Sequence, residues 1–122
     1  TRGAAIVSSP IGPYSPVVRA GDWLVCSGQL GVRDGALVDG GVAAQTAQAM
    51  ANLRALLEGR GASLAHVVKT AVFLLDMADF AAMNTAYAEA FGDHRPARST
   101  LAVAGLPLAA MVEIEAWAWM GA

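Results

Sequence analysis

Cysteine and charged residues are scarce in this chain, and both shortages narrow its possible functions. The single cysteine, Cys26, has no intrachain partner, which excludes the disulfide framework of small secreted domains. Charged residues make up only 15%, and eight Lys and Arg against ten Asp and Glu give a formal net charge of −2. No basic surface is therefore available to neutralise a row of phosphates, so nucleic acid and anionic membranes are poor candidate partners.

Long hydrophobic runs are missing as well. The longest uncharged stretches, such as residues 99–112, fall short of the roughly 20 apolar residues that a bilayer-spanning helix needs. Gly105 and Pro107 interrupt that stretch, and no signal peptide is visible. A length of 122 residues, 56% of them hydrophobic, suits one folded unit. We therefore expect a single domain over residues 1–122 in a soluble, cytoplasmic protein.

The sequence also lacks the common motifs of cofactor chemistry. Its two histidines, His66 and His94, have no neighbouring cysteine that could complete a zinc motif. No Gly-x-Gly-x-x-Gly opens a helix, and there is no Gly-Lys-Ser/Thr loop for nucleotide phosphates. Ser27 is not in a nucleophile elbow, because Val25 stands where the first glycine should be. Cys26 is expected to be a buried, unreactive thiol. We expect neither a metal nor a cofactor.

What the sequence does contain is an alternation of strand and helix signals. The patterns predict strands at residues 17–18, 23–27, 31–32, 36–38, 66–75, 99–104 and 111–119, and amphipathic helices at residues 42–58 and 79–92. This order predicts a two-layer α+β sandwich with both helices on one face of a mixed sheet. Apolar residues on the second face would then stay exposed in a monomer, and a symmetric oligomer is the simplest cover.

Local signals add detail to this arrangement. Asp34-Gly35 supplies the positive φ angles of a tight hairpin turn. The β-branched run over residues 66–75 is typical of a central strand that is covered on both faces. Asp79 is expected to cap the second helix and Gly92 to end it.

Two carboxylates share one face of the last strand with two tryptophans. Alternation places Glu113, Glu115, Trp117 and Trp119 on one side of that strand. Glutamates on an exposed edge would only solubilise the strand. A glutamate buried beside an apolar wall could instead act as a general acid or base. The spacing leaves both interpretations open.

Two further polar residues interrupt the expected pattern. Asn84 falls on the apolar face of the second helix, where it is either a structural amide bonded to a loop or a ligand contact. Pro96 stiffens the approach to Arg98 at the start of a strand, where a guanidinium fork could bind a small organic acid. An ion pair with a surface acid is the alternative for Arg98.

Six short blocks, in order, resemble the reactive intermediate deaminase family, also called the YjgF or Rid family. They are Ile-Gly-Pro-Tyr-Ser at 11–15, Ser-Gly-Gln at 27–29, Val-Lys-Thr at 68–70 with Phe73 and Asp76, the helix start from Asp79 to Asn84, Arg-Pro-Ala-Arg-Ser at 95–99, and Val-Glu-Ile-Glu-Ala at 112–116. The resemblance extends over nearly the whole chain.

This resemblance implies a homotrimer with a chorismate-mutase-like fold and active sites in the clefts between subunits. It also implies hydrolysis of amino-acid-derived enamines and imines, such as 2-aminoacrylate, 2-iminopropanoate and 2-iminobutanoate, to a 2-keto acid and ammonia without a cofactor. Two alternatives stay open: a non-catalytic trimer that senses small 2-keto acids, and a 3-aminoacrylate deaminase of pyrimidine breakdown.

The resemblance also assigns roles to individual residues. Arg98 would bind the substrate carboxylate through two parallel hydrogen bonds. Glu115 would activate the attacking water and pass its proton to the departing nitrogen. Tyr14 would close the pocket and hydrogen-bond near the reacting centre.

The remaining carried-over residues line the pocket. These are Ser27, Gly28, Asn84 and, through its backbone carbonyl, Thr100. Many family members have cysteine at position 100, so any regulation through a thiol there is lost in this chain. The hairpin from Leu30 to Val38 is also shorter than in many relatives, which bears on substrate range.

Overall fold

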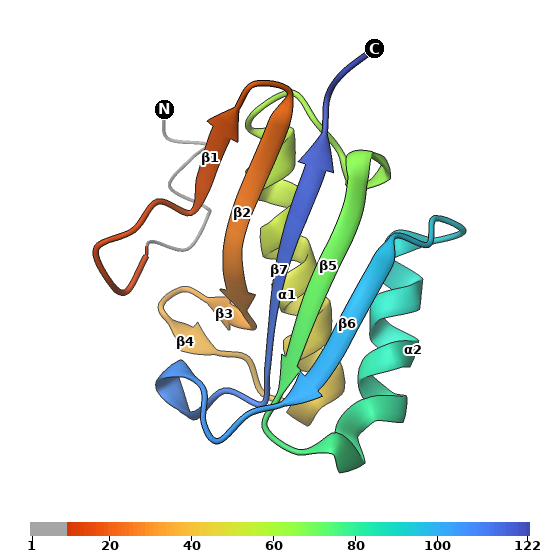
Figure 1. Ribbon diagram of the computed structural model, residues 1–122. Helices are drawn as coiled ribbons and strands as arrows, with labels where there is room; N and C mark the ends of the chain where they lie inside the picture. The colour runs from red at the N-terminus through yellow and green to blue at the C-terminus, as the bar shows by residue number, and fades with distance from the viewer. Residues whose placement is uncertain (1–9) are drawn as a thin grey trace.

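The computed structural model describes residues 10–122, which form a twisted sheet backed by two helices (Figure 1). The strands are β1 (Val17–Ala20), β2 (Trp23–Leu30), β3 (Val32–Arg33), β4 (Ala36–Leu37), β5 (Val67–Leu74), β6 (Ala97–Ala102) and β7 (Val112–Trp119). The α-helices are α1 (Gly41–Glu58) and α2 (Phe80–Phe91), and short 3₁₀ turns span Leu64–His66, Met77–Asp79 and Pro107–Ala109.

Five strands form the main sheet in the order β1-β2-β7-β5-β6. Only β5 and β6 are parallel, and α2 makes the crossover between them. β3 and β4 form a separate hairpin, in which Asp34 and Gly35 have φ angles of 54° and 83°. The mixed sheet, the tight turn and the α+β class are therefore confirmed.

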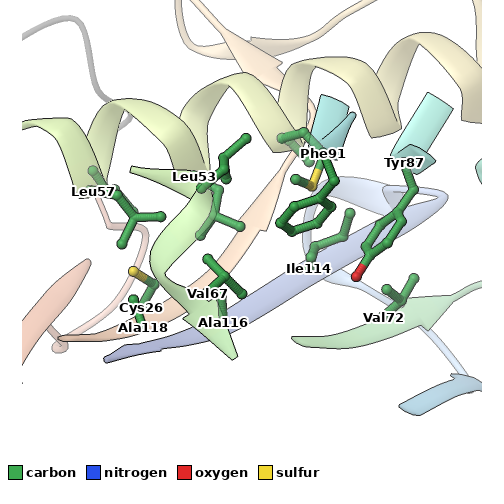
Figure 2. Packing of buried hydrophobic residues seen from close by; sticks show 14 of the residues in the cluster. Cys26, Leu53, Leu57, Val67, Val72, Tyr87, Phe91, Ile114, Ala116 and Ala118 are labelled. Carbon is green, nitrogen blue, oxygen red and sulfur yellow. The ribbon is translucent and has the colours of Figure 1, made fainter. Parts of the chain in front are cut away.

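Both helices cover the same face of the sheet, as predicted. The inward-facing residues of β7, which are Val112, Ile114, Ala116 and Ala118, are fully buried beneath them. Figure 2 shows Leu53 and Leu57 of α1 and Phe91 of α2 above this strand. Apolar burial between these two layers provides most of the driving force for folding.

The strand β5 differs from its prediction in one respect. It lies inside the sheet, between β7 and β6, as expected. It is not covered on both faces, however, because Val68 is 43% exposed and Leu75, just beyond the strand, is 41% exposed. Two helices on one side cannot screen the other side, so the apolar run on β5 is half open in the single chain.

The start of α2 also differs from its prediction. Asp79 makes no side-chain capping hydrogen bond. Instead, Asp76 Oδ1 accepts the Ala78 N–H at 2.9 Å, because a 3₁₀ turn precedes the helix and its unpaired N–H groups come earlier in the chain. Gly92 ends α2 with a φ of 67°, as predicted. In the described residues, no helix is both long and apolar enough to cross a membrane.

Candidate functional site

Glu113 and Glu115 lie on the sheet face that the helices leave open. In the pairing with β5, Glu113 is opposite Phe73 and Glu115 is opposite Ala71. Partial burial raises the pKa of both carboxyls, and the charge of Glu115 raises the pKa of Glu113 further. Either glutamate can therefore take up a proton more readily than a fully hydrated carboxylate.

A break in the β2–β7 pairing makes room for one of these glutamates. The register shifts between Cys26 and Gln29, as in a β-bulge. A Cβ added at Gly28, inside that break, would lie 2.5 Å from Glu113 Oε2. The absence of a side chain at position 28 thus allows the Glu113 carboxylate to lie against the backbone of β2.

The segment before β1 is tied to the same break. Ser27 Oγ donates a hydrogen bond to the Ser15 carbonyl at 2.7 Å, and the Ser27 N–H donates to the Pro16 carbonyl at 2.8 Å. These two bonds hold the chain next to Tyr14, whose side chain is 48% exposed. The Ser27 hydroxyl, predicted to line the pocket, therefore serves to position this segment.

Tyr14, Gly28 and Glu113 line one cleft of about 750 Å³, which we call the glutamate cleft. Its other walls come from the 10–16 segment, the end of β2, the β3–β4 hairpin, α1 and the 107–108 turn. Glu115, to which the family resemblance assigned the catalytic role, is not among the lining residues. Of the two glutamates, only Glu113 opens into this cleft.

Arg98 lies elsewhere, on the edge strand β6. Its Nη2 donates to Asn84 Oδ1 at 2.8 Å, and its guanidinium carbon is 4.8 Å from the centre of the Tyr87 ring and 5.6 Å from that of Phe80. We call Phe80, Asn84, Tyr87 and Arg98 the arginine cluster. Within residues 10–122, no carboxylate forms an ion pair with Arg98, so the guanidinium is held in place without being neutralised.

Tyr87 is fixed in turn by the sheet. Its hydroxyl and Thr70 Oγ1 are 2.7 Å apart in a buried hydrogen bond. Burial raises the pKa of Tyr87, while the Thr70 bond and the charges of Arg98 and Arg95 act in the opposite direction. The neutral ring presents its face to Arg98 as a cation–π partner. Sequence periodicity marked Phe80 and Tyr87 only as apolar positions, and their contact with Arg98 was missed.

The arginine cluster and the glutamate cleft are on different sides of the sheet. Arg98 pairs with Thr70, and Thr100 pairs with Val72. Thr70 and Val72 are fully buried beneath the helices, so Arg98 and Thr100 lie on that same side of the sheet. Glu113 points to the open face. One chain therefore carries two half-sites that do not meet within it.

Cys26 and the two histidines lie in surroundings that indicate structural roles. The Cys26 thiol is buried, and burial raises its pKa to about 11, as expected for an unreactive cysteine. His94 Nε2 donates to the Val67 carbonyl at 2.7 Å, and His66 Nδ1 accepts the Ser63 N–H at 3.1 Å. Among residues 10–122 there is no group of three side chains able to hold a metal ion.

Comparisons with known proteins converge on one family. The family model described as "Endoribonuclease L-PSP" matches residues 5–120. A RutC family protein of Pyrococcus horikoshii is 46% identical over 112 residues, covering 90% of this chain and 89% of the relative. The protein named 2-iminobutanoate/2-iminopropanoate deaminase of Homo sapiens is 42% identical over 113 residues, covering 91% of this chain and 82% of the relative.

Further matches agree in sequence and in fold. The mitochondrial protein mmf1 of Schizosaccharomyces pombe is 43% identical over 110 residues, covering 88% of this chain and 68% of the relative. The solved structure of a putative endoribonuclease from Thermotoga maritima is 43% identical, with a TM-score of 0.91 over 96% of this chain and 94% of that one.

Proposed function

This chain belongs to the endoribonuclease L-PSP family, the YjgF/Rid family expected from its sequence, and from that membership we propose that it is an imine deaminase. Its substrates are 2-aminoacrylate, 2-iminopropanoate and 2-iminobutanoate, which it hydrolyses to a 2-keto acid and ammonia. The observation that carries the proposal is the arginine cluster, because Asn84 and two aromatic rings hold Arg98 with its charge left for a carboxylate ligand. An acidic chain with few cations does not suit RNA cleavage, despite the family's description.

Arg98 binds the substrate carboxylate. A guanidinium offers two parallel N–H groups in one plane, which match the two oxygens of a carboxylate. Asn84 occupies one donor at Nη2, and the faces of Tyr87 and Phe80 restrict how the fork can turn. This restriction fixes the imine carbon relative to the attacking water.

A glutamate activates that water. The family resemblance assigned this role to Glu115, but the cleft geometry favours Glu113, which shares the glutamate cleft with Tyr14 and Gly28. The carboxylate takes a proton as the water oxygen bonds to the imine carbon. The resulting acid passes this proton to the nitrogen, which gives a carbinolamine. The carboxylate then takes the hydroxyl proton of the carbinolamine and passes it to the nitrogen, so that the C–N bond breaks, the C=O bond forms, and a 2-keto acid and ammonia leave. A raised pKa suits a group that must both accept and donate a proton.

The two half-sites complete each other in an oligomer. We place the arginine cluster of one subunit against the glutamate cleft of the next, in the homotrimer expected from the family. The open face supports such an assembly, since Trp117, Val25 and Val68 line a shallow apolar hollow of about 410 Å³ there. Sedimentation should therefore show a species of three chains, and a stable 12.5 kDa monomer at micromolar concentration would contradict this arrangement.

The test couples an amino-acid oxidase, which releases imines in place, to trapping by semicarbazide. The wild type should lower the trapped fraction. Arg98→Ala should lower kcat/KM for imine hydrolysis by roughly thirtyfold or more, because a charged bidentate contact is removed. Arg54→Ala is the matched control, since Arg54 is exposed on α1 and lines no part of the cleft. Full turnover by Arg98→Ala would remove Arg98 from the mechanism.

A matched pair of variants separates the two glutamates. Glu113→Gln should lose most turnover while Glu115→Gln keeps it, and the reverse result would return the role to Glu115.

The two alternatives predict different outcomes in solution. A sensor of 2-keto acids would bind pyruvate or 2-oxobutanoate in calorimetry and hydrolyse no imine above background. A deaminase of pyrimidine breakdown would prefer 3-aminoacrylate over the 2-imines. The cytoplasmic location likewise stays a proposal, to be checked by fractionation.

A further inference from the structure

A second arginine lies on the far wall of the glutamate cleft. Arg33 ends β3, immediately before the Asp34-Gly35 turn, and lines the cleft with the α1 residue Gln48. Its Nη1 donates to Gln48 Oε1 at 3.4 Å. The hairpin thus directs this guanidinium toward α1.

A chain of hydrogen bonds sets the direction of the Gln48 amide. Asn52 Nδ2 donates to the carbonyls of Leu30 at 3.0 Å and Val32 at 2.9 Å, which uses both of its N–H groups. Asn52 Oδ1 is then left to accept, and it accepts from Gln48 Nε2 at 2.9 Å. Gln48 Oε1 consequently faces Arg33 as an acceptor. The buried Asn52 therefore orients Gln48, and Gln48 restrains Arg33.

The charge of Arg33 is not neutralised by this arrangement. Gln48 is a neutral partner, and in the part of the chain that the structure describes no carboxylate lies within ion-pair distance of Arg33. The other charged residues of the cleft wall are Asp34 and Glu113, both acidic, so Arg33 is its only cation among residues 10–122. An oriented guanidinium with free N–H groups is a recognition element for a carboxylate.

The cleft reaches from Glu113 to Arg33 along one wall of the chain. Its volume in the single chain is about 750 Å³, part of which the neighbouring subunit fills in the trimer proposed above. Apolar walls accompany the polar ones, and they come from Ile11, Leu30, Ala51, Ala55 and Leu108. Such a lining suits a substrate whose carbon chain continues beyond the imine carbon.

We propose that Arg33 binds the distal carboxylate of imines whose side chain itself ends in a carboxylate, the class derived from acidic amino acids. This inference rests on the proposed function and extends its substrate class. The imine carbon would lie near Glu113, and the side chain would run along the apolar wall to Arg33.

The test measures selectivity between two imines. One is released from leucine by an amino-acid oxidase and the other from glutamate by a glutamate oxidase, each in the presence of semicarbazide. Arg33→Gln should lower the ratio of kcat/KM for the glutamate imine over the leucine imine by roughly tenfold or more, since a hydrogen-bonded charge pair is lost. Arg54→Gln should leave the ratio unchanged, and an unchanged ratio in Arg33→Gln would overturn the proposal.

A binding measurement separates this inference from the proposed function. Calorimetry compares 2-oxoglutarate with 2-oxobutanoate on the wild type and on Arg33→Gln, with circular dichroism as the check of folding. If neither imine is hydrolysed, the deaminase proposal fails, yet weaker binding of 2-oxoglutarate to Arg33→Gln alone would still support the anion site. Equal binding of 2-oxoglutarate to both proteins would overturn it.

Discussion

The two faces of β7 share one strand but have opposite surroundings. Toward the helices, the strand presents small and branched apolar side chains that are fully buried, such as Ile114 and Ala116. Toward the open side it presents Glu113, Glu115, Trp117 and Trp119, all of which keep contact with solvent. The covered face stabilises the fold, whereas the open face carries ionisable groups and large rings that remain partly exposed in a single chain.

This difference separates stability from function along the same eight residues. A change on the covered face is felt by the packed core, which cannot relax fully. A change on the open face meets solvent in the monomer, so its effect is on the glutamate cleft or on assembly. Substitutions on the two faces therefore test this division directly.

The largest expected effect is on the covered face. Ile114→Ala should lower the free energy of unfolding by about 2–5 kcal/mol, because it leaves a cavity between β7 and the helices. Trp117→Ala, on the other face of the same strand, should weaken oligomer assembly and should lower the monomer's free energy of unfolding by less than Ile114→Ala does. Urea titration with sedimentation measures both, and equal loss of monomer stability in the two variants would break the comparison.

The next largest effect is expected at Gly28, where the missing side chain leaves room for the Glu113 carboxylate. Gly28→Ala places a methyl group 2.5 Å from Glu113 Oε2, so the carboxylate must move, at a cost of about 1–3 kcal/mol that should appear mainly as lost turnover. Gly105→Ala is the control, because a Cβ there meets no atom within 4 Å. Comparable turnover in the two variants would show that the position of Glu113 is unimportant.

A smaller effect is the pH dependence of the free energy of unfolding that Glu113 and Glu115 on the open face produce. The folded-state pKa of Glu113 and of Glu115 is raised above the unfolded value, so the folded state binds more protons in that window. The free energy of unfolding contributed by these groups should accordingly fall as pH rises through the raised pKa values, upward from about pH 4. Glu113→Gln should flatten this slope in urea titrations across that range, and a slope as steep as that of the wild type would contradict the assignment.

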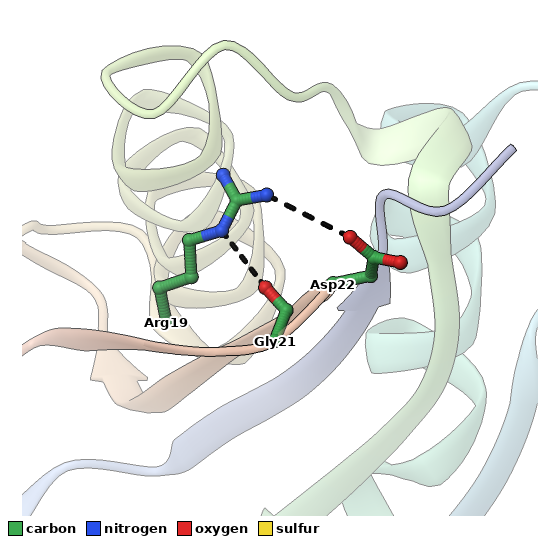
Figure 3. Close-up of polar contacts among 3 residues, drawn as sticks. All are labelled: Arg19, Gly21 and Asp22. Carbon is green, nitrogen blue, oxygen red and sulfur yellow. Dashed lines mark hydrogen bonds and ion pairs between the residues drawn. The ribbon is translucent and has the colours of Figure 1, made fainter.

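The smallest expected effect is at the exposed β1–β2 turn. Arg19 Nη2 and Asp22 Oδ1 are 3.9 Å apart, and both side chains are 52% exposed (Figure 3). Asp22→Asn should change the free energy of unfolding by less than about 1 kcal/mol, since solvent screens such pairs. Arg19 also donates from Nε to the Gly21 carbonyl at 2.9 Å, and this bond survives the change. Thermal denaturation should therefore give nearly the wild-type midpoint.

The elements that could be predicted are those with a local cause. Alternation in β7 depends only on residue order, and it correctly placed Glu113, Glu115, Trp117 and Trp119 on one face of the strand. The turn at Asp34-Gly35 and the end of α2 at Gly92 follow from the positive φ angles that these residues tolerate. The cap at Asp79 was wrong, because a 3₁₀ turn moved the first unpaired N–H groups to the residues after Asp76.

The candidate site was only partly predictable for the same reason. Arg98 and Asn84 were singled out separately, and the structure joins them through a hydrogen bond across 14 positions. Alternation alone cannot distinguish Glu113 from Glu115, because both point to the same face. The break in β2 at Gly28 decides which of them enters the cleft, and that break exists only when β2 pairs with β7.

By itself, the sequence determined the α+β class, the division of β7 into two faces and the family, because periodicity, turn residues and short motifs are properties of neighbouring positions. The tertiary structure alone decided which glutamate opens into the cleft, what holds Arg98, and that Arg33 is oriented through Gln48 and Asn52. These contacts join strands and helices far apart in the chain. Their geometry depends on register and packing, which no local pattern encodes.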